Sequence, residues 1–298
     1  MTKQLKPQTI EKLIHEALAI EAEEAKEAGT LGFMARAMVQ ATLPHRAVKG
    51  NEFVRRNGAY KMSMIAPSHV GLPYGNIPRL LMAWLSTEAV KTKSRELALG
   101  DSLSDFMRQL GQPVAGNPIK RVKMHTRRLF STAITAEYTD KAPTTEQPDQ
   151  MLTAIMNYTV AESAMLFWNA KDPDQSSLWN STVTLGQQFY DELIECPVPV
   201  DLRALKAIKR SPLALDIYCW LTYRMSYLKH RTRIPWGLLQ QQFGSDYPLT
   251  ARGKADFKRN FLLQLQKVQA VYPAANLDTE QSSLILKPSK PHIKRLAK

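Results

Sequence analysis

Long apolar runs and cysteines are both scarce in this chain of 298 residues. Its two cysteines, Cys196 and Cys219, are too few for a disulfide framework, so we expect both thiols to be buried and reduced. No CxxC, CxxH or HExxH spacing indicates a metal site. No run approaches the roughly 18 apolar residues of a membrane span, and the N-terminus lacks the apolar core of a signal peptide. These absences predict a cytoplasmic protein that needs no membrane, metal or other cofactor.

The residue patterns of common catalytic sites are missing as well. Gly253-Lys254 resembles the end of a phosphate-binding loop, but Ala255 follows it and the required upstream glycine is absent. The six histidines are scattered without pairing, and we expect His125 to contact phosphate rather than to transfer protons. Neighbouring carboxylates occur only in an acidic helix and a proline-containing loop, and neither resembles a two-metal site. We therefore predict that the protein is not an enzyme.

The positive charge is concentrated rather than spread. The net charge is +13, and residues 201–298 alone carry +12, whereas residues 101–200 carry −4. Within that acidic block, residues 117–130 hold five basic side chains and no acidic one. A cationic helix inside an acidic stretch indicates a placed patch, and the overall charge predicts a polyanionic partner.

The main organisational feature is a repeated order of elements over residues 78–139 and 211–287. Each pass runs through a long apolar helix, a short strand, a short helix closed by glycine, a basic amphipathic helix and strand-like alternation. The tryptophans of the two opening helices, Trp84 and Trp220, are 136 residues apart, and the closing glycines, Gly111 and Gly244, are 133 apart. This order is typical of a winged helix, a helix-turn-helix variant that inserts a helix into the DNA major groove.

The two passes predict specific boundaries. In the first, a helix ends at Thr92, and further elements follow at 95–99, 102–110, 117–130, 132–139 and 152–159, the loop between the last two serving as the wing. In the second, the elements after the opening helix are expected at 232–234, 235–243, 252–272 and 276–286, with a wing tip at 280–282.

The remaining segments complete the expected domain organisation. Residues 1–30 form an acidic helical arm, 33–43 a short helix, 52–65 a hairpin with a type I′ turn on Asn57-Gly58, and 182–195 a strand and a helix. The prolines of 196–200 suggest an extended linker. We expect an α+β fold with two tandem winged-helix domains after an N-terminal helical arm. The first, 31–195, would serve DNA binding and dimerisation, and the second, 201–298, would be the main DNA-binding domain with a basic tail from Lys287.

A helical wheel separates buried and free faces of the two basic helices. Ile119, Val122, Thr126, Leu129 and Phe130 share the core side of the first, and Phe257, Phe261, Leu265 and Val268 that of the second. The residues expected to contact DNA lie opposite or flank that face: Asn117, Lys120, Arg121, Met124, Arg127 and Arg128 in the first helix, and Arg252, Lys254, Lys258, Arg259, Gln266 and Lys267 in the second.

These faces suggest distinct roles. Arginine pairs bidentately with guanine, so Arg121, Arg128, Arg252 and Arg259, spaced seven residues apart in each helix, are the expected base readers. The lysines and Arg127 would hold phosphates. For either basic helix alone, an ordinary solvated face is the better explanation, because charged runs are weak evidence of binding. Two basic helices at matching positions of a repeated pattern favour DNA contact.

A series of short motifs runs along the chain: Phe33-Met-Ala-Arg36, Leu43-Pro-His-Arg46, Gly71-Leu-Pro-Tyr-Gly75, Pro78-Arg-Leu-Leu-Met-Ala-Trp84, Thr87-Glu-Ala89, Leu99-Gly-Asp-Ser-Leu103, Phe106-Met107, Leu110-Gly111, Arg127-Arg-Leu-Phe130, Ile234-Pro-Trp236, Phe243-Gly244, Phe257-Lys-Arg259, Val271-Tyr-Pro273 and Lys287-Pro-Ser-Lys-Pro-His292. In these motifs the chain resembles the RepA-type replication initiator (Rep) proteins encoded by plasmids. The resemblance covers about residues 30–293 and is most specific over 71–111.

The resemblance implies a protein that binds repeated origin sequences (iterons), promotes opening of the adjacent AT-rich DNA and recruits host replication proteins such as an initiator and a helicase. It also implies a homodimer that represses its own promoter, and thereby plasmid copy control. Two alternatives stay open. A transcriptional repressor with the same modules would not open an origin, and a primase would need a cluster of metal-binding carboxylates that the sequence does not reveal.

Overall fold

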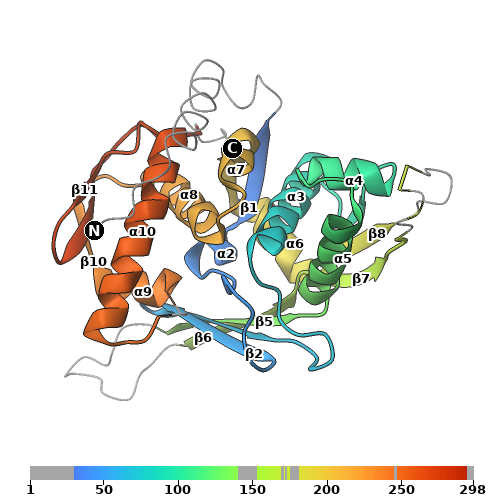
Figure 1. Ribbon diagram of the computed structural model, residues 1–298, viewed down its shortest axis with the longest axis horizontal. Coiled ribbons are helices and arrows are strands. Elements are labelled where there is room, and N and C mark those ends of the chain that lie inside the picture. The colour runs from blue at the N-terminus through green and yellow to red at the C-terminus, as the bar shows by residue number, and fades with distance from the viewer. Residues whose placement is uncertain are drawn as a thin grey trace.

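The computed structural model describes residues 30–139, 153–168, 171, 173–174, 181–244 and 247–293. The predicted arm up to residue 29, the loop 140–152 and the part of the predicted tail from residue 294 on lie outside the described residues. The start of that tail packs on the second unit, where His292 lies 2.8 Å from the Tyr218 hydroxyl. The described part is a mixed α/β structure with several antiparallel sheets, as expected (Figure 1). No described helix combines the length and the apolar character that a membrane crossing requires.

Two units repeat the same order of elements. Each has a long helix, a short strand, a short helix, a basic helix and two further strands. In the first unit these are α3 (Asn76–Thr92), β4 (Glu96–Ala98), α4 (Leu103–Gln109), α5 (Gly116–Phe130), β7 (Ala161–Met165) and β8 (Thr182–Leu185). In the second they are α8 (Pro212–Met225), β10 (Thr232–Pro235), α9 (Trp236–Phe243), α10 (Ala251–Val271), β11 (Leu277–Thr279) and β12 (Ser283–Leu286).

The strand order is also shared. The strand that precedes the short helix pairs with the last strand of its unit, giving β4-β8-β7 in the first and β10-β12-β11 in the second, with antiparallel pairing throughout. The repeat predicted from the sequence is therefore present in three dimensions. In the second unit the predicted elements match the observed ones closely.

The first unit contains an inserted sheet, and the prediction that its strands flank the wing was wrong. The strands near 132–139 and 152–159 were expected to flank its wing. They are instead β5 (Ala133–Thr139) and β6 (Thr153–Thr159), which join β2 (Glu52–Asn57) and β3 (Tyr60–Ile65) in a separate sheet of order β2-β3-β5-β6. The physical reason is one buried row across that sheet, formed by Phe53, Met64, Ile134 and Tyr158. The predicted β2-β3 hairpin is present, but its turn is not the expected type I′ turn on Asn57-Gly58. Asn57 pairs with Tyr60, so Gly58 and Ala59 are the central residues, and of these only Gly58 has a positive φ, of 60°, which is the glycine position of a type II′ turn.

The expected linker at 196–200 is a strand. Residues Pro197–Asp201 form β9, which pairs antiparallel with β1 (Leu31–Ala35). The prolines do keep the segment extended, but Val198 and Val200 alternate with them and are buried, so the strand belongs to the core. The expected helix at 33–43 is likewise only α2 (Arg36–Gln40), because its first residues lie in β1. The predicted strand and helix at 182–195 are β8 and α6 (Gln187–Glu195).

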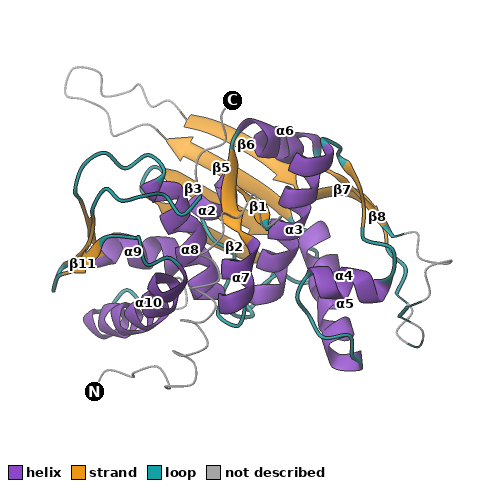
Figure 2. Cartoon of the chain, turned by 90° about the horizontal axis from the view of Figure 1, so that it is seen from above, coloured by secondary structure: helices purple, strands orange, loops and turns teal. Residues whose placement is uncertain are grey.

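One continuous hydrophobic core runs through both units. The opening helices α3 and α8 lie at its centre and are buried on nearly every side, which fits their apolar character all round. Helix α8 begins at Ser211, whose hydroxyl accepts a hydrogen bond from the Ala214 amide, with Pro212 in the first turn. Between α8 and β9 lies the short helix α7 (Leu202–Ile208). Figure 2 shows α5 and α10 on the side of the molecule away from β5 and β6.

Candidate nucleic-acid interface

Helix α5 presents a cationic face to solvent. Its buried side consists of Ile119, Val122, Thr126 and Leu129, as the helical wheel predicted, together with His125. Asn117, Lys120, Arg121 and Arg127 are exposed, and so is Lys123. Within the described part of the chain, none of the four cations Lys120, Arg121, Lys123 and Arg127 has a carboxylate within ion-pair distance. Their charges are therefore available to an external polyanion.

Two predicted positions on this face are occupied internally. Arg128 is half-buried, its Nε donates to the carbonyl of Val70 at 3.0 Å, and its guanidinium lies 5.2 Å from the ring centre of Tyr74. It thus attaches the loop before α3 to α5, a role that the wheel did not reveal. Met124 is half-buried as well.

His125 does not lie beside the cationic face, so the expected phosphate contact is wrong. It is buried, and its ring packs edge-on against that of Tyr74 with 4.8 Å between the ring centres. Its Nδ1 has no hydrogen-bond partner among the described residues. Burial, aided by the charges of Arg128 and Arg121, lowers the pKa of His125 to about 4. The side chain is a neutral core residue.

Helix α10 is held by aromatic packing and a tight start. Thr250 accepts a hydrogen bond from the Gly253 amide as the N-cap. A Cβ at Gly253 would lie 2.0 Å from the carbonyl oxygen of Pro248, so only glycine fits there. Phe257 and Phe261 are fully buried with Trp236 of α9, as the predicted stripe requires. The packing orients the opposite face of α10 toward solvent.

The predicted residues of α10 divide into free and engaged groups. Arg252, Lys254 and Gln266 are exposed, and Arg252 and Lys254 have no hydrogen bond or ion pair with any other described residue. Arg259 is exposed but pairs with Asp256 at 2.7 Å. Lys267 donates to the Gln264 side chain, and burial lowers its pKa.

Lys258 supports the hairpin of the second unit. Its Nζ donates to the carbonyls of Glu280 at 3.0 Å and Gln281 at 2.9 Å, and it lies 5.0 Å from the ring centre of Trp236. Arg233, which the sequence reading did not single out, pairs with the Glu280 carboxylate at 3.1 Å. The only sequence signal for this cluster is an acidic residue at the predicted wing tip. The hairpin tip is therefore fixed against the start of β10 and against α10.

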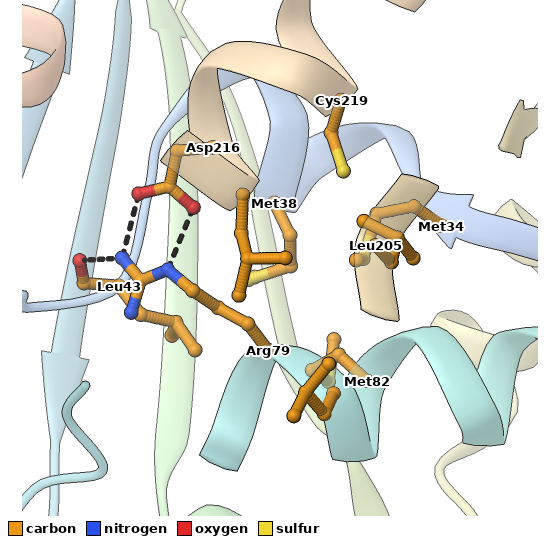
Figure 3. A pocket seen from close by; sticks show the side chains of 10 residues that line it. Met34, Met38, Leu43, Arg79, Met82, Leu205, Asp216 and Cys219 are labelled. Atoms are coloured by element: carbon orange, nitrogen blue, oxygen red, sulfur yellow. Dashed lines mark hydrogen bonds and ion pairs between the residues drawn. The ribbon is translucent and has the colours of Figure 1, made fainter. Parts of the chain in front are cut away.

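The two units meet at a buried charge cluster that sequence reasoning also missed. Arg79 of α3 donates to both carboxylate oxygens of Asp216 of α8, each at 2.7 Å, and His45 lies 2.7 Å from Oδ2 of the same carboxylate. The remaining guanidinium hydrogens go to the carbonyls of Leu43, Pro44 and Gly75. Figure 3 shows the ion pair at the edge of a small pocket lined by methionines and Cys219.

The electrostatics of this cluster follow from its burial. Burial by itself would raise the pKa of Asp216, but the Arg79 charge and the hydrogen bonds of His45 and Arg79 hold it below its usual value. Burial lowers the pKa of His45, and the Asp216 hydrogen bond compensates only in part. Both cysteines are free; Cys219 is buried, as predicted, but Cys196 is only half-buried. Burial raises the pKa of Cys219. No group of three or more metal-binding side chains occurs in the described residues.

One solved structure, of low sequence identity, supports the fold. Domains 2 and 3 of RctB, solved as a selenomethionine derivative, match with a TM-score of 0.54 at 10% identity, covering 87% of this chain and 99% of theirs. A second structure of RctB domains 2-3 matches with a TM-score of 0.49 at 13% identity, covering 84% of this chain and 96% of that one. No curated protein sequence matches.

A match to a family model shows the family, and it covers the first unit and the start of the second. The model of the family described as "Plasmid encoded RepA protein" matches residues 72–236, more than half of the chain. The matched region runs from the loop before α3 to the first residue of α9, and so contains α5 and both partners of the buried Arg79–Asp216 pair. The chain belongs to the family of plasmid-encoded RepA replication initiators.

Proposed function

We propose that this protein binds double-stranded DNA sequence-specifically through two winged-helix units, each of which inserts its basic helix into a major groove. The observation that carries the proposal is the repeated topology with one shared strand order, in which α5 and α10 occupy equivalent positions. Both helices expose cations that have no internal partner, and both lie on the same side of the molecule (Figure 2). Such a helix after a short helix is the reading element of helix-turn-helix proteins.

Individual roles follow from which side chains are free. Arg121 and Arg252 are the proposed base readers, because they are exposed and unpaired. Arg259 can join them, since an exposed ion pair such as that with Asp256 contributes little and is easily exchanged for DNA. Lys120, Arg127 and Lys254 would bind phosphates. Arg128 and Lys258 act instead as internal supports that hold the loop before α3 and the hairpin tip.

The biological role is initiation of plasmid replication. On this proposal the protein binds iterons at the origin, promotes opening of the adjacent AT-rich DNA and recruits host replication proteins without catalysing a reaction itself. Membership of the plasmid-encoded RepA family supports this role. A homodimer that binds the protein's own promoter would account for autorepression and copy control.

The decisive experiment combines binding with origin opening. Wild-type protein is titrated onto a duplex that carries the direct repeats flanking its own gene and onto a scrambled duplex of equal composition. The expected result is preference for the repeats and permanganate-reactive thymines in the adjoining AT-rich DNA. Arg252→Gln should lose the preference, whereas Arg56→Gln, on the outer face of the four-stranded sheet, should retain it. Binding to the repeats without any opening would instead indicate a repressor.

A further inference from the structure

The short helix α7 and the two residues after it form a third cationic element. Residues 202–210 contain four basic side chains and no carboxylate. Arg203 is engaged with Asp201 at 2.8 Å, but Lys206 and Arg210 are exposed and have no hydrogen bond or ion pair with another described residue. Lys209 is half-buried and donates to the carbonyl of Gly111.

These contacts place α7 at the junction of the two units. The carbonyl of Lys209 accepts a hydrogen bond at 2.9 Å from Asn76, the first residue of α3, while its Nζ reaches the turn between α4 and α5. The Lys206 side chain lies beside the same glycine of that turn, and α7 also packs against α10. Along the horizontal axis that Figure 1 and Figure 2 share, α7 lies between α5 and α10. The free charges of α7 are therefore fixed between the two proposed reading helices.

The position of α7 matches where the DNA backbone would lie if α5 and α10 read successive major grooves. Two helices that read successive major grooves are roughly 34 Å apart along the duplex, and the backbone of the intervening minor groove then faces the protein. Its phosphates carry one charge per roughly 1.7 Å of helix axis, so a neutral protein surface there would leave them without counter-charge. Resting on the function proposed above, we infer that Lys206 and Arg210 bind the phosphates between the two major grooves.

The competing structural explanation covers only part of this cluster. A cation in the last turn of a helix complements the helix dipole, which accounts for Lys206. The Gly111 contact accounts for Lys209. Neither explains Arg210, which follows the helix, is exposed and lacks a partner among the described residues. A phosphate contact explains both free charges together.

The test uses the full chain with Lys206→Gln/Arg210→Gln and, as the matched control, Arg56→Gln. Affinity for one origin repeat and for random duplex is measured over a range of salt concentrations. The double variant should lower the slope of log K against log salt by about 2, because each lost phosphate contact removes about 0.9. Its affinity should fall by the same factor on both duplexes, since phosphates carry no sequence information. The control should change neither quantity.

Ethylation interference locates the effect. In the wild type, ethylation of phosphates between the two protected major grooves should inhibit binding, and in the double variant this inhibition should disappear while the groove contacts persist. An unchanged slope and an unchanged interference pattern would overturn the inference and would point to an acidic protein as the partner of α7. If the variants Arg121→Gln and Arg252→Gln also bind the origin repeat as tightly as the wild type does, the proposed function itself fails, and the inference fails with it.

Discussion

Arg79 and Asp216 form a buried ion pair with two hydrogen bonds of 2.7 Å that joins the opening helices of the two units. Their side chains are 4% and 8% exposed, so the pair is shielded from solvent. Breaking a buried pair by removing one partner costs about 3–5 kcal/mol, whereas replacing both partners by apolar residues is often neutral or stabilising. The two hydrogen bonds of the pair have a defined geometry, and they therefore fix how α3 and α8 face one another.

A spacing function for this pair can be separated from a stability function. We expect Asp216→Asn to lower the free energy of unfolding, and Arg79→Met/Asp216→Leu to recover most of it. If the pair also positions the units, the apolar variant should still bind the native repeat and a repeat lengthened by one or two base pairs between the two groove contacts with similar affinity. The wild type should prefer the native spacing. Denaturant unfolding and binding to the spacing series provide the two measurements. Recovery of both stability and discrimination would reduce the pair to a packing element.

The salt dependence of binding reports how many phosphates the protein contacts. If the free cations of α5, α7 and α10 together neutralise about 8 phosphates, log K should fall with log salt at a slope of roughly −7. Fluorescence anisotropy on one origin repeat between low and physiological salt provides the measurement. A slope shallower than about −3 would contradict a grip by both units.

The base-reading residues are expected to differ from the phosphate-binding ones in specificity. Arg121→Gln or Arg252→Gln should cost about 1–3 kcal/mol on the origin repeat and relax preference at one or two base pairs. Lys254→Gln should weaken specific and random DNA equally, because it removes only a phosphate contact. If both arginine variants lose as much affinity for random duplex as for the origin repeat, Arg121 and Arg252 do not read bases.

Much of the fold was predictable because local patterns and tertiary context agree. In the second unit, an apolar helix, a proline-bounded strand and an aromatic stripe with phenylalanines at 257 and 261 all indicate the same structure, and the predicted elements match the observed ones there. The β2-β3 hairpin was also predictable, because two alternating strands flank a glycine that adopts positive φ, although the turn lies on Gly58-Ala59 rather than on Asn57-Gly58. Signals of this kind depend only on residues close in sequence.

The features that were missed depend on partners far along the chain. The strand at 197–201 is defined by pairing with 31–35, and the Arg79–Asp216 contact spans 137 residues. The sequence shows such residues but not which of them meet. For the same reason the helical wheel placed Arg128 on the free face of α5, while the loop carbonyls that occupy it come from residues 70 and 72.

The buried histidine of α5 predicts a pH dependence of stability. The pKa of His125 is about 4 in the folded protein, below the value near 6.5 expected for an unfolded chain. The contribution of the neutral side chain is therefore complete above about pH 6.5 and is lost as the pH falls toward 4, because only the unfolded state then binds the proton. The loss approaches at most about 1.4 kcal/mol per pH unit for this residue. Urea unfolding of wild type and His125→Phe at pH 7 and 5 should show a smaller decline for the variant.

Pairing of β9 with β1 changes what an insertion at 197–200 should do. A flexible linker would tolerate added residues, and each unit would remain folded. Here Val198 and Val200 are buried and the strand carries the chain into α7, so an inserted Gly-Ser stretch must break the β1–β9 register and expose core. We expect a large loss of stability and of protection across the whole core in hydrogen exchange. The same stretch inserted at Gly58, an exposed hairpin turn, should be tolerated. Equal tolerance at both sites, with lowered affinity only for the complete repeat, would restore the linker interpretation.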